Sequence, residues 1–155
     1  MSTPSVSSLG IRDFTAEQLV RIARLFASDD SHAGQVDLSV TERQRIPLDS
    51  TEHLEVWLMV WPVGSSTGWH DHGQAAGAYV VVTGELIEES RRGGSADDHL
   101  LGKGEERAFG PGHIHNMTNV GDTPALTVHA YSPGLTEMTP YELVDGRLVP
   151  VNPKH

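Results

Sequence analysis

The chain has 155 residues, a length that suits one domain with a substantial buried core. Its 21 acidic and 11 basic residues give a formal charge of −10, which argues against a nucleic-acid or anionic-membrane binder, because phosphate recognition needs clustered Lys and Arg. The lack of cysteine excludes disulfides, thiolate zinc sites, iron–sulfur clusters and a cysteine nucleophile. No apolar run approaches the roughly 20 residues of a spanning helix, and the first ten residues lack the pattern of a secretory signal, so we expect a cytoplasmic protein.

The N-terminal part of the chain predicts one helix. Residues 1–12 are rich in serine, and we expect them to form a frayed tail before a single domain over residues 13–155. Thr15 and Gln18 have the spacing of a capping box. Apolar residues behind them recur at the intervals of one helical face, namely Leu19, Ile22, Ala23 and Phe26. We therefore predict a helix over residues 16–27.

The rest of the chain predicts short strands. Helical periodicity disappears, and runs of β-branched and aromatic residues alternate with turn signals at close spacing. The predicted strands are 43–48, 55–61, 78–82, 85–88, 106–109, 114–118, 125–131, 141–144 and 147–150, with a loop over 90–95. Asp145-Gly146 is a strong two-residue hairpin signal between the last two strands. The pattern predicts a mainly β fold, a small sandwich or barrel preceded by one helix.

Histidines are the most distinctive feature of the composition, and several of the nine occur in pairs. His70 and His72 form one His-x-His, and His113 and His115 form another; residues two apart in an extended segment point to the same side. His129 lies on a further predicted strand. Because thiolate ligands are absent, a metal bound here would be held by neutral imidazoles. Two such pairs in one small β domain favour a metal site over ordinary surface histidines.

These residues resemble the two motifs of the cupins, small β-barrels with a metal inside. The first motif is matched by Gly64, His70, His72, Gly77 and Gly84, with Gly77 standing where most cupins have a glutamate ligand. The second motif is matched by Pro111, His115 and Asn119, with one residue fewer than usual between the proline and the histidine. The resemblance implies that the predicted β fold is a single small cupin barrel.

A cupin that keeps three histidines and lacks the glutamate is similar to the thiol dioxygenases, specifically the type I cysteine dioxygenase family. The segment Thr127-x-His129-x-Tyr131-Ser132-Pro133 resembles the family's Ser-x-His-x-Tyr-Ser-Pro. The likeness runs from about Arg43 to Pro133. Animal members carry a cysteine at the position of Gly77 and crosslink it to the tyrosine, and this chain cannot form that bond.

The resemblance implies a ligand set and a cofactor. His70, His72 and His115 would bind Fe(II), with a small thiol and O2 as the reactants. His113 is an alternative third ligand, because it lies on the same side of its strand as His115. A further alternative makes His129 a ligand. Three neutral imidazoles would leave iron its full 2+ charge, which favours an anionic thiolate.

The resemblance also implies how substrate is held. Thr127, His129 and Tyr131 would form the outer triad, in which His129 orients the Tyr131 hydroxyl near the substrate. The family binds the substrate carboxylate with an arginine on the strand before the first motif. An ungapped count from the first motif places Gln44 there, whereas the strand pattern favours Arg45, whose planar guanidinium matches a carboxylate. Relatives with Arg prefer cysteine, and relatives with Gln resemble the 3-mercaptopropionate dioxygenases.

The sequence therefore predicts an iron-dependent thiol dioxygenase that adds both atoms of O2 to sulfur. Conversion of L-cysteine to cysteine sulfinate is the first candidate reaction, and 3-mercaptopropionate is the alternative substrate. A metal-dependent isomerase or lyase without redox chemistry and a ligand-binding cupin without catalysis remain as other classes. Neither a monomer nor a homodimer is favoured by the sequence.

Overall fold

A computed structural model of the protein describes residues 13–29, 31, 34, 36–92, 95–135 and 138–151. The predicted tail over residues 1–12 lies outside them. The elements are α1 (Ala16–Ala27), β1 (Gln44–Ser50), β2 (Glu55–Trp61), β3 (Trp69–His70), β4 (Ala76–Thr83), β5 (Leu86–Arg92), β6 (Ser95–Leu101), β7 (Glu106–Phe109), β8 (His115–Asn119), β9 (Ala125–Ser132), β10 (Pro140–Val144) and β11 (Arg147–Pro150).

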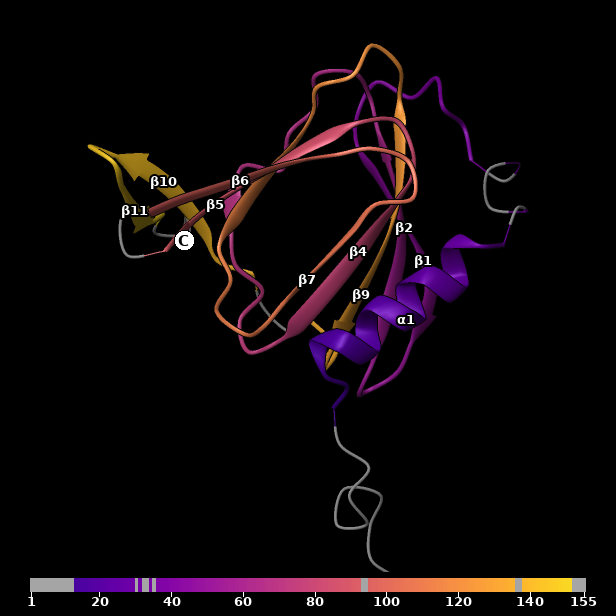
Figure 1. The fold of residues 1–155 in the computed structure, drawn as a ribbon, viewed down its shortest axis with the longest axis horizontal. Helices are drawn as coiled ribbons and strands as arrows, with labels where there is room; N and C mark the ends of the chain where they lie inside the picture. The colour runs from indigo at the N-terminus through magenta and orange to yellow at the C-terminus, as the bar shows by residue number, and fades with distance from the viewer. Residues whose placement is uncertain are drawn as a thin grey trace, which may run out of the picture.

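The strands form two antiparallel sheets that lie face to face (Figure 1). One sheet has the order β1-β2-β9-β4-β7, and the other has the order β11-β10-β3-β8-β5-β6. Among the described residues, no strand of one sheet pairs with a strand of the other, so the sheets do not form a closed barrel. The predicted mainly β fold with an N-terminal helix is confirmed, and the cupin barrel takes the form of an open jelly-roll sandwich.

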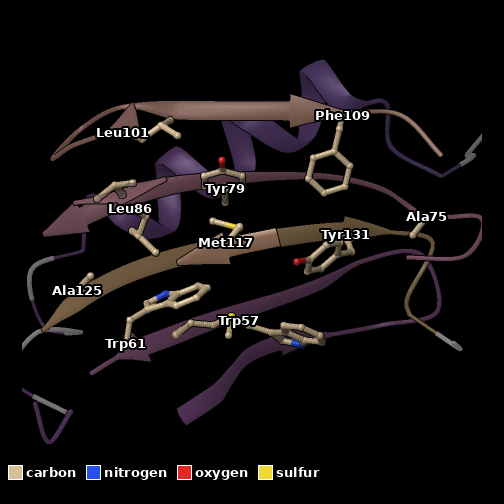
Figure 2. Packing of buried hydrophobic residues seen from close by; sticks show 12 residues of the cluster. Trp57, Trp61, Ala75, Tyr79, Leu86, Leu101, Phe109, Met117, Ala125 and Tyr131 are labelled. Atoms are coloured by element: carbon tan, nitrogen blue, oxygen red, sulfur yellow. The ribbon is translucent and has the colours of Figure 1, made fainter. Parts of the chain in front are cut away.

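Strand β2 separates two hydrophobic clusters because both of its faces are buried. Trp57 and Trp61 point between the sheets (Figure 2), and with Met59 they belong to a cluster that includes residues of both sheets. The alternate residues, which are Val56, Leu58 and Val60, point to the outer face that α1 covers. This double burial explains why β2 is a continuous apolar run rather than an alternating one.

Helix α1 covers the outer face of the five-stranded sheet (Figure 1). Leu19 and Ala23 are fully buried against it. The capping box is present, because the Gln18 backbone N–H donates to the Thr15 hydroxyl and the Thr15 N–H donates to the Gln18 side chain. Among the described residues, no helix combines the length and the apolar composition needed to cross a membrane.

The predicted loop over 90–95 is shorter than expected, because residues 90–92 belong to β5 and residue 95 belongs to β6, while residues 93 and 94 lie outside the described residues. Ser90 lies opposite Asp97 in this ladder, and its hydroxyl donates to the Asp97 carbonyl over 2.8 Å. Strand β6 has the sequence SADDHLL and is exposed along most of its length. Main-chain pairing with β5, rather than burial of an apolar face, makes it a strand, so it has no hydrophobic signature in the sequence.

The C-terminal hairpin forms as its turn residues predict. Asp145 and Gly146 both have positive φ angles, 51° and 78°, as a type I′ turn requires. Asp71 attaches this hairpin to the segment that follows β3. Its carboxylate accepts hydrogen bonds from the Thr139 N–H and the Tyr141 hydroxyl. Asp71 therefore faces away from the two histidines that flank it.

Gly77 allows two aromatic rings to pack over β4. It pairs with Phe109 of β7 on one side and with Tyr131 of β9 on the other. A Cβ atom at Gly77 would lie 2.5 Å from Phe109 Cζ and 2.9 Å from Tyr131 Cδ1. Both rings project between the sheets (Figure 2). The lack of a side chain thus fixes where the Tyr131 ring lies.

We expect Gly77→Ala to lower the free energy of unfolding by about 1–3 kcal/mol, because the added methyl group overpacks this contact. Gly110→Ala is the matched control, since nothing lies within 4 Å of a Cβ at that position. Urea denaturation of both variants measures the difference. Equal stability of the two variants would show that the rings do not pack against β4.

Candidate metal centre

Three of the predicted histidines converge between β3 and β8. His70 of β3 lies directly opposite His115 of β8 in the strand pairing. His72 follows in the turn that leads to β4. The ring centroids of the three are 4.7 to 4.8 Å apart. Each ring offers a nitrogen, and these nitrogens all lie within 4.8 Å of one another. The structure therefore brings together His70, His72 and His115.

Burial keeps these imidazoles neutral. Desolvation lowers the pKa of His70 to about 4, and the neighbouring His115 adds to the effect. Desolvation is also the main cause that lowers the pKa of His72 and of His115. A neutral imidazole has one nitrogen with a free lone pair, which is the form that binds a metal ion.

Hydrogen bonds orient two of the rings. His70 Nδ1 lies 2.9 Å from the Gly68 carbonyl oxygen, so it is the protonated nitrogen and donates to that oxygen. His115 Nδ1 lies 2.6 Å from a carboxylate oxygen of Glu88 and donates to it. In both rings Nε2 is then left as the lone-pair donor, as is usual for metal-binding histidines.

His72 fits a metal ion most clearly. Its ring is 2% exposed, and neither ring nitrogen has a hydrogen-bond partner within the described residues. An unsatisfied buried polar group costs about 1–3 kcal/mol. The ring packs against both Phe109 and Tyr131, whose centroids are 4.8 and 5.1 Å away. A metal ion at the centre of the three histidines would satisfy one of these nitrogens, and three imidazoles suit Fe, Zn, Ni or Cu.

Glu88 of β5 is a site residue that the sequence reasoning missed. Its side chain is fully buried, and one of its oxygens accepts hydrogen bonds from both His113 and His115. The other oxygen accepts from Arg107 Nε at 3.0 Å. Burial raises the pKa of Glu88, but the hydrogen bonds and charge interactions with His113 and His115 together lower it by more, so the carboxylate is ionised. The sequence does contain a signal for it: Glu88 lies two residues after the apolar Leu86 on a predicted strand, and residues two apart point to the same face.

His113 and His129, the alternative ligands, lie outside the group of three. His113 Nε2 points at Glu88 over 2.9 Å, which places it behind His115. Glu88, His113 and His115 also lie close enough to hold an ion, but the hydrogen bonds just described already connect them. His129 uses both of its nitrogens in the chain of hydrogen bonds described next.

The predicted triad forms a chain of hydrogen bonds along β9. Trp61 Nε1–H donates to the Thr127 hydroxyl at 2.9 Å, and this hydroxyl lies 2.7 Å from His129 Nε2. His129 Nδ1 lies 3.1 Å from the Tyr131 hydroxyl. Desolvation lowers the pKa of His129 to about 3, so its ring is neutral. Because Trp61 only donates, the Thr127 hydroxyl accepts from Trp61 and donates its own hydrogen bond to His129 Nε2. His129 Nδ1–H can then donate to the Tyr131 oxygen, which leaves the tyrosine O–H free to donate elsewhere.

Pairing with β2 decides which of Gln44 and Arg45 faces the interior. Arg45 lies opposite Met59, which points between the sheets, and Gln44 lies opposite Val60, which points towards α1. The Arg45 guanidinium lies 3.9 Å from the centre of the Trp57 ring. Gln44 also borders the cavity, but its strand position belongs to the opposite face. Arg45 is therefore the inward residue of the two.

A cavity of about 460 Å³ lies beside the histidines. Its lining includes His70, His115, His129, Tyr131 and Arg45. His72 does not line it and packs against Phe109 and Tyr131 instead. A small molecule in this space would thus contact two candidate metal-binding histidines, a phenol and a guanidinium. A few convergent polar groups in a cavity are typical of small-molecule sites.

Comparison with known proteins identifies the family of this chain. Residues 10–143 match the sequence profile of the family described as cysteine dioxygenase type I. The chain belongs to the type I cysteine dioxygenase family. The predicted family membership is therefore confirmed, and the match extends beyond the segment from Arg43 to Pro133.

Solved structures share the fold of this family member. A Klebsiella pneumoniae protein with a double-stranded β-helix domain is 23% identical, with a TM-score of 0.59, over 68% of this chain and 90% of its own. A Bacillus halodurans protein is 20% identical, with a TM-score of 0.60, over 70% of this chain and 81% of its own. An oxalate oxidase solved with the substrate analogue glycolate is 20% identical, with a TM-score of 0.58, over 66% of this chain and 57% of its own. At these identities the likeness shows the cupin-type fold alone.

We expect His72→Ala to lose bound metal and His113→Ala to retain it. The first change removes a nitrogen from the group of three, whereas His113 faces Glu88. Each variant is loaded with Fe(II) without oxygen and desalted, and its iron content is measured by mass spectrometry. Circular dichroism checks that both variants fold. Full iron retention by His72→Ala would remove this residue from the ligand set.

We expect Glu88→Gln to weaken metal affinity by about 10–100-fold, because the partner that orients His115 and increases its basicity loses its charge. Glu89→Gln is the matched control, since the neighbouring Glu89 bonds to Asn116 instead. Competition with a metal chelator gives the affinity of both variants. Unchanged affinity in Glu88→Gln would show that the carboxylate has no influence on the ligand.

Proposed function

We propose that this protein is an iron(II)-dependent thiol dioxygenase, which converts a small thiol carboxylate into its sulfinate: RSH + O2 → RSO2H. The observation that carries the proposal is the meeting of three neutral imidazoles beside a cavity that also holds a phenol and a guanidinium. Membership of the type I cysteine dioxygenase family supports it. L-cysteine is the first candidate substrate, because relatives with an inward arginine prefer it, and 3-mercaptopropionate is the alternative.

His70, His72 and His115 would hold the metal. Bound iron would supply a redox-active Lewis acid whose 2+ charge no carboxylate ligand reduces, and such a charge stabilises a thiolate. The carboxylate of Glu88 is not a metal ligand in this arrangement; it accepts a hydrogen bond from Nδ1 of the His115 ring, on the side away from the metal-binding Nε2. The carboxylate of Glu88 thus orients the His115 ring without binding the metal itself.

Arg45 and Tyr131 would position the substrate. The Arg45 guanidinium can bind a carboxylate through two parallel hydrogen bonds, and its contact with Trp57 limits its movement. Tyr131 is protonated, because burial raises the pKa of its hydroxyl. His129 and Thr127 orient that hydroxyl so that its proton can be donated to the substrate or to a reacting oxygen.

We expect the iron-loaded protein to consume one O2 for each sulfinate formed from cysteine or 3-mercaptopropionate. An oxygen electrode measures the uptake, and mass spectrometry measures the product. Absence of oxygen uptake with every thiol, in protein that retains its iron, would contradict the proposal and favour a cupin without redox chemistry.

The same assay tests the role of Arg45. Hydrogen bonds to charged groups contribute about 1.5–3 kcal/mol, so Arg45→Ala should raise KM for carboxylate thiols by roughly 10–100-fold. Gln44→Ala is the matched control on the opposite face of β1, and cysteamine, which lacks a carboxylate, is the control substrate. A rise in KM with Gln44→Ala alone would assign the carboxylate to Gln44.

A further inference from the structure

A second guanidinium lines the cavity beside Arg45. Arg43 stands two residues before it, immediately ahead of β1, and both residues line the same cavity. Two residues of extended chain span about 7 Å. The Arg43 guanidinium lies 5.6 Å from the centre of the Trp61 ring, and that of Arg45 lies 3.9 Å from Trp57. Both tryptophans project from the inward face of β2 (Figure 2), so the two cations lie on one wall.

Neither cation is neutralised by the protein. Within the described part of the chain, Arg43 and Arg45 form no ion pair and no hydrogen bond. By contrast, the guanidiniums of Arg24, Arg91 and Arg107 each bind a carboxylate. Desolvation lowers the pKa of Arg43, and the charge of Arg45 lowers it further. The two cations therefore repel each other, and a bound anion would relieve that repulsion.

The described lining of the cavity contains no aspartate or glutamate. Arg43 and Arg45 line the same cavity as His70 and Tyr131, so the two positive charges share this space with a candidate metal ligand and the phenol. Such a wall attracts anions.

We propose that Arg43 and Arg45 together bind two anionic groups of one ligand, so that the preferred substrate is a short thiol dicarboxylate. A thiol with one carboxylate would pair with one guanidinium and leave the other without a counter-charge. A thiol with two carboxylates pairs with both. The thiol part of this proposal rests on the proposed function, whereas the recognition of two carboxylates stands on the arginines alone.

Two matched thiols test the proposal. 2-Sulfanylbutanedioate is 3-sulfanylpropanoate with a second carboxylate on the carbon that bears sulfur. Calorimetry on iron-loaded protein without oxygen should show that the dicarboxylate binds at least tenfold more tightly, which corresponds to about 1.4 kcal/mol. Arg43→Gln should abolish this preference. Arg91→Gln, which removes a guanidinium that stacks on Trp69 outside the cavity, should preserve it.

The outcomes separate this proposal from the proposed function. Butanedioate and butanoate, which carry no thiol, repeat the comparison without any need for oxidation of sulfur. A preference for butanedioate in protein that never consumes O2 with a thiol would support the arginine pair and overturn the dioxygenase. Oxygen uptake with equal affinity for both thiols would overturn the arginine pair alone. Equal weakening of both thiols by Arg43→Gln would likewise overturn it, since that is the effect of a structural arginine.

Discussion

Desolvation of the imidazoles is the constraint on which the site depends. A histidine in water titrates near pH 6.5, and three protonated rings with centroids less than 5 Å apart would repel each other and any cation. Burial between two sheets lowers the pKa of each ring and keeps it a neutral donor. The same burial leaves both His72 nitrogens without a protein partner in the described residues, which makes a bound cation favourable.

Negative and positive charges lie on opposite sides of the candidate metal centre. The anionic Glu88 lies behind His115, where His113 and Arg107 also bind it. The cationic Arg43 and Arg45 lie on the cavity side, where a ligand enters. The hydrogen bonds to Glu88 fix a ligand ring from behind without occupying a metal position. The guanidiniums are free for an incoming anion.

The sandwich brings these groups together because strand faces alternate. Thr127, His129 and Tyr131 are two residues apart along β9, so all three project inward. Gly77, opposite Tyr131 on β4, makes room for the phenol ring and for Phe109. His72 packs against both of these rings, so the packing of the hydrophobic core and the position of a candidate ligand are parts of one arrangement.

Local patterns in the sequence determined much of this protein. The capped helix, most of the strands, the Asp145-Gly146 turn and the histidine pairs with their family motifs are all short-range features, and short-range physics is enough to predict them. Strand β6 was missed because it is polar and depends on main-chain pairing. The cation–π contacts and the partners of Glu88 also lie outside any local pattern, since they join residues far apart in the chain.

Tertiary structure decided which side each polar residue faces. Whether Arg45 or Gln44 points inward depends on pairing with β2, and a shift of one residue would exchange them. Likewise, His115 rather than His113 joins His70 and His72 because His115 lies opposite His70, whereas His113 turns to Glu88. A sequence records which residues are two apart, but only the neighbouring strand determines which face of the sheet they occupy.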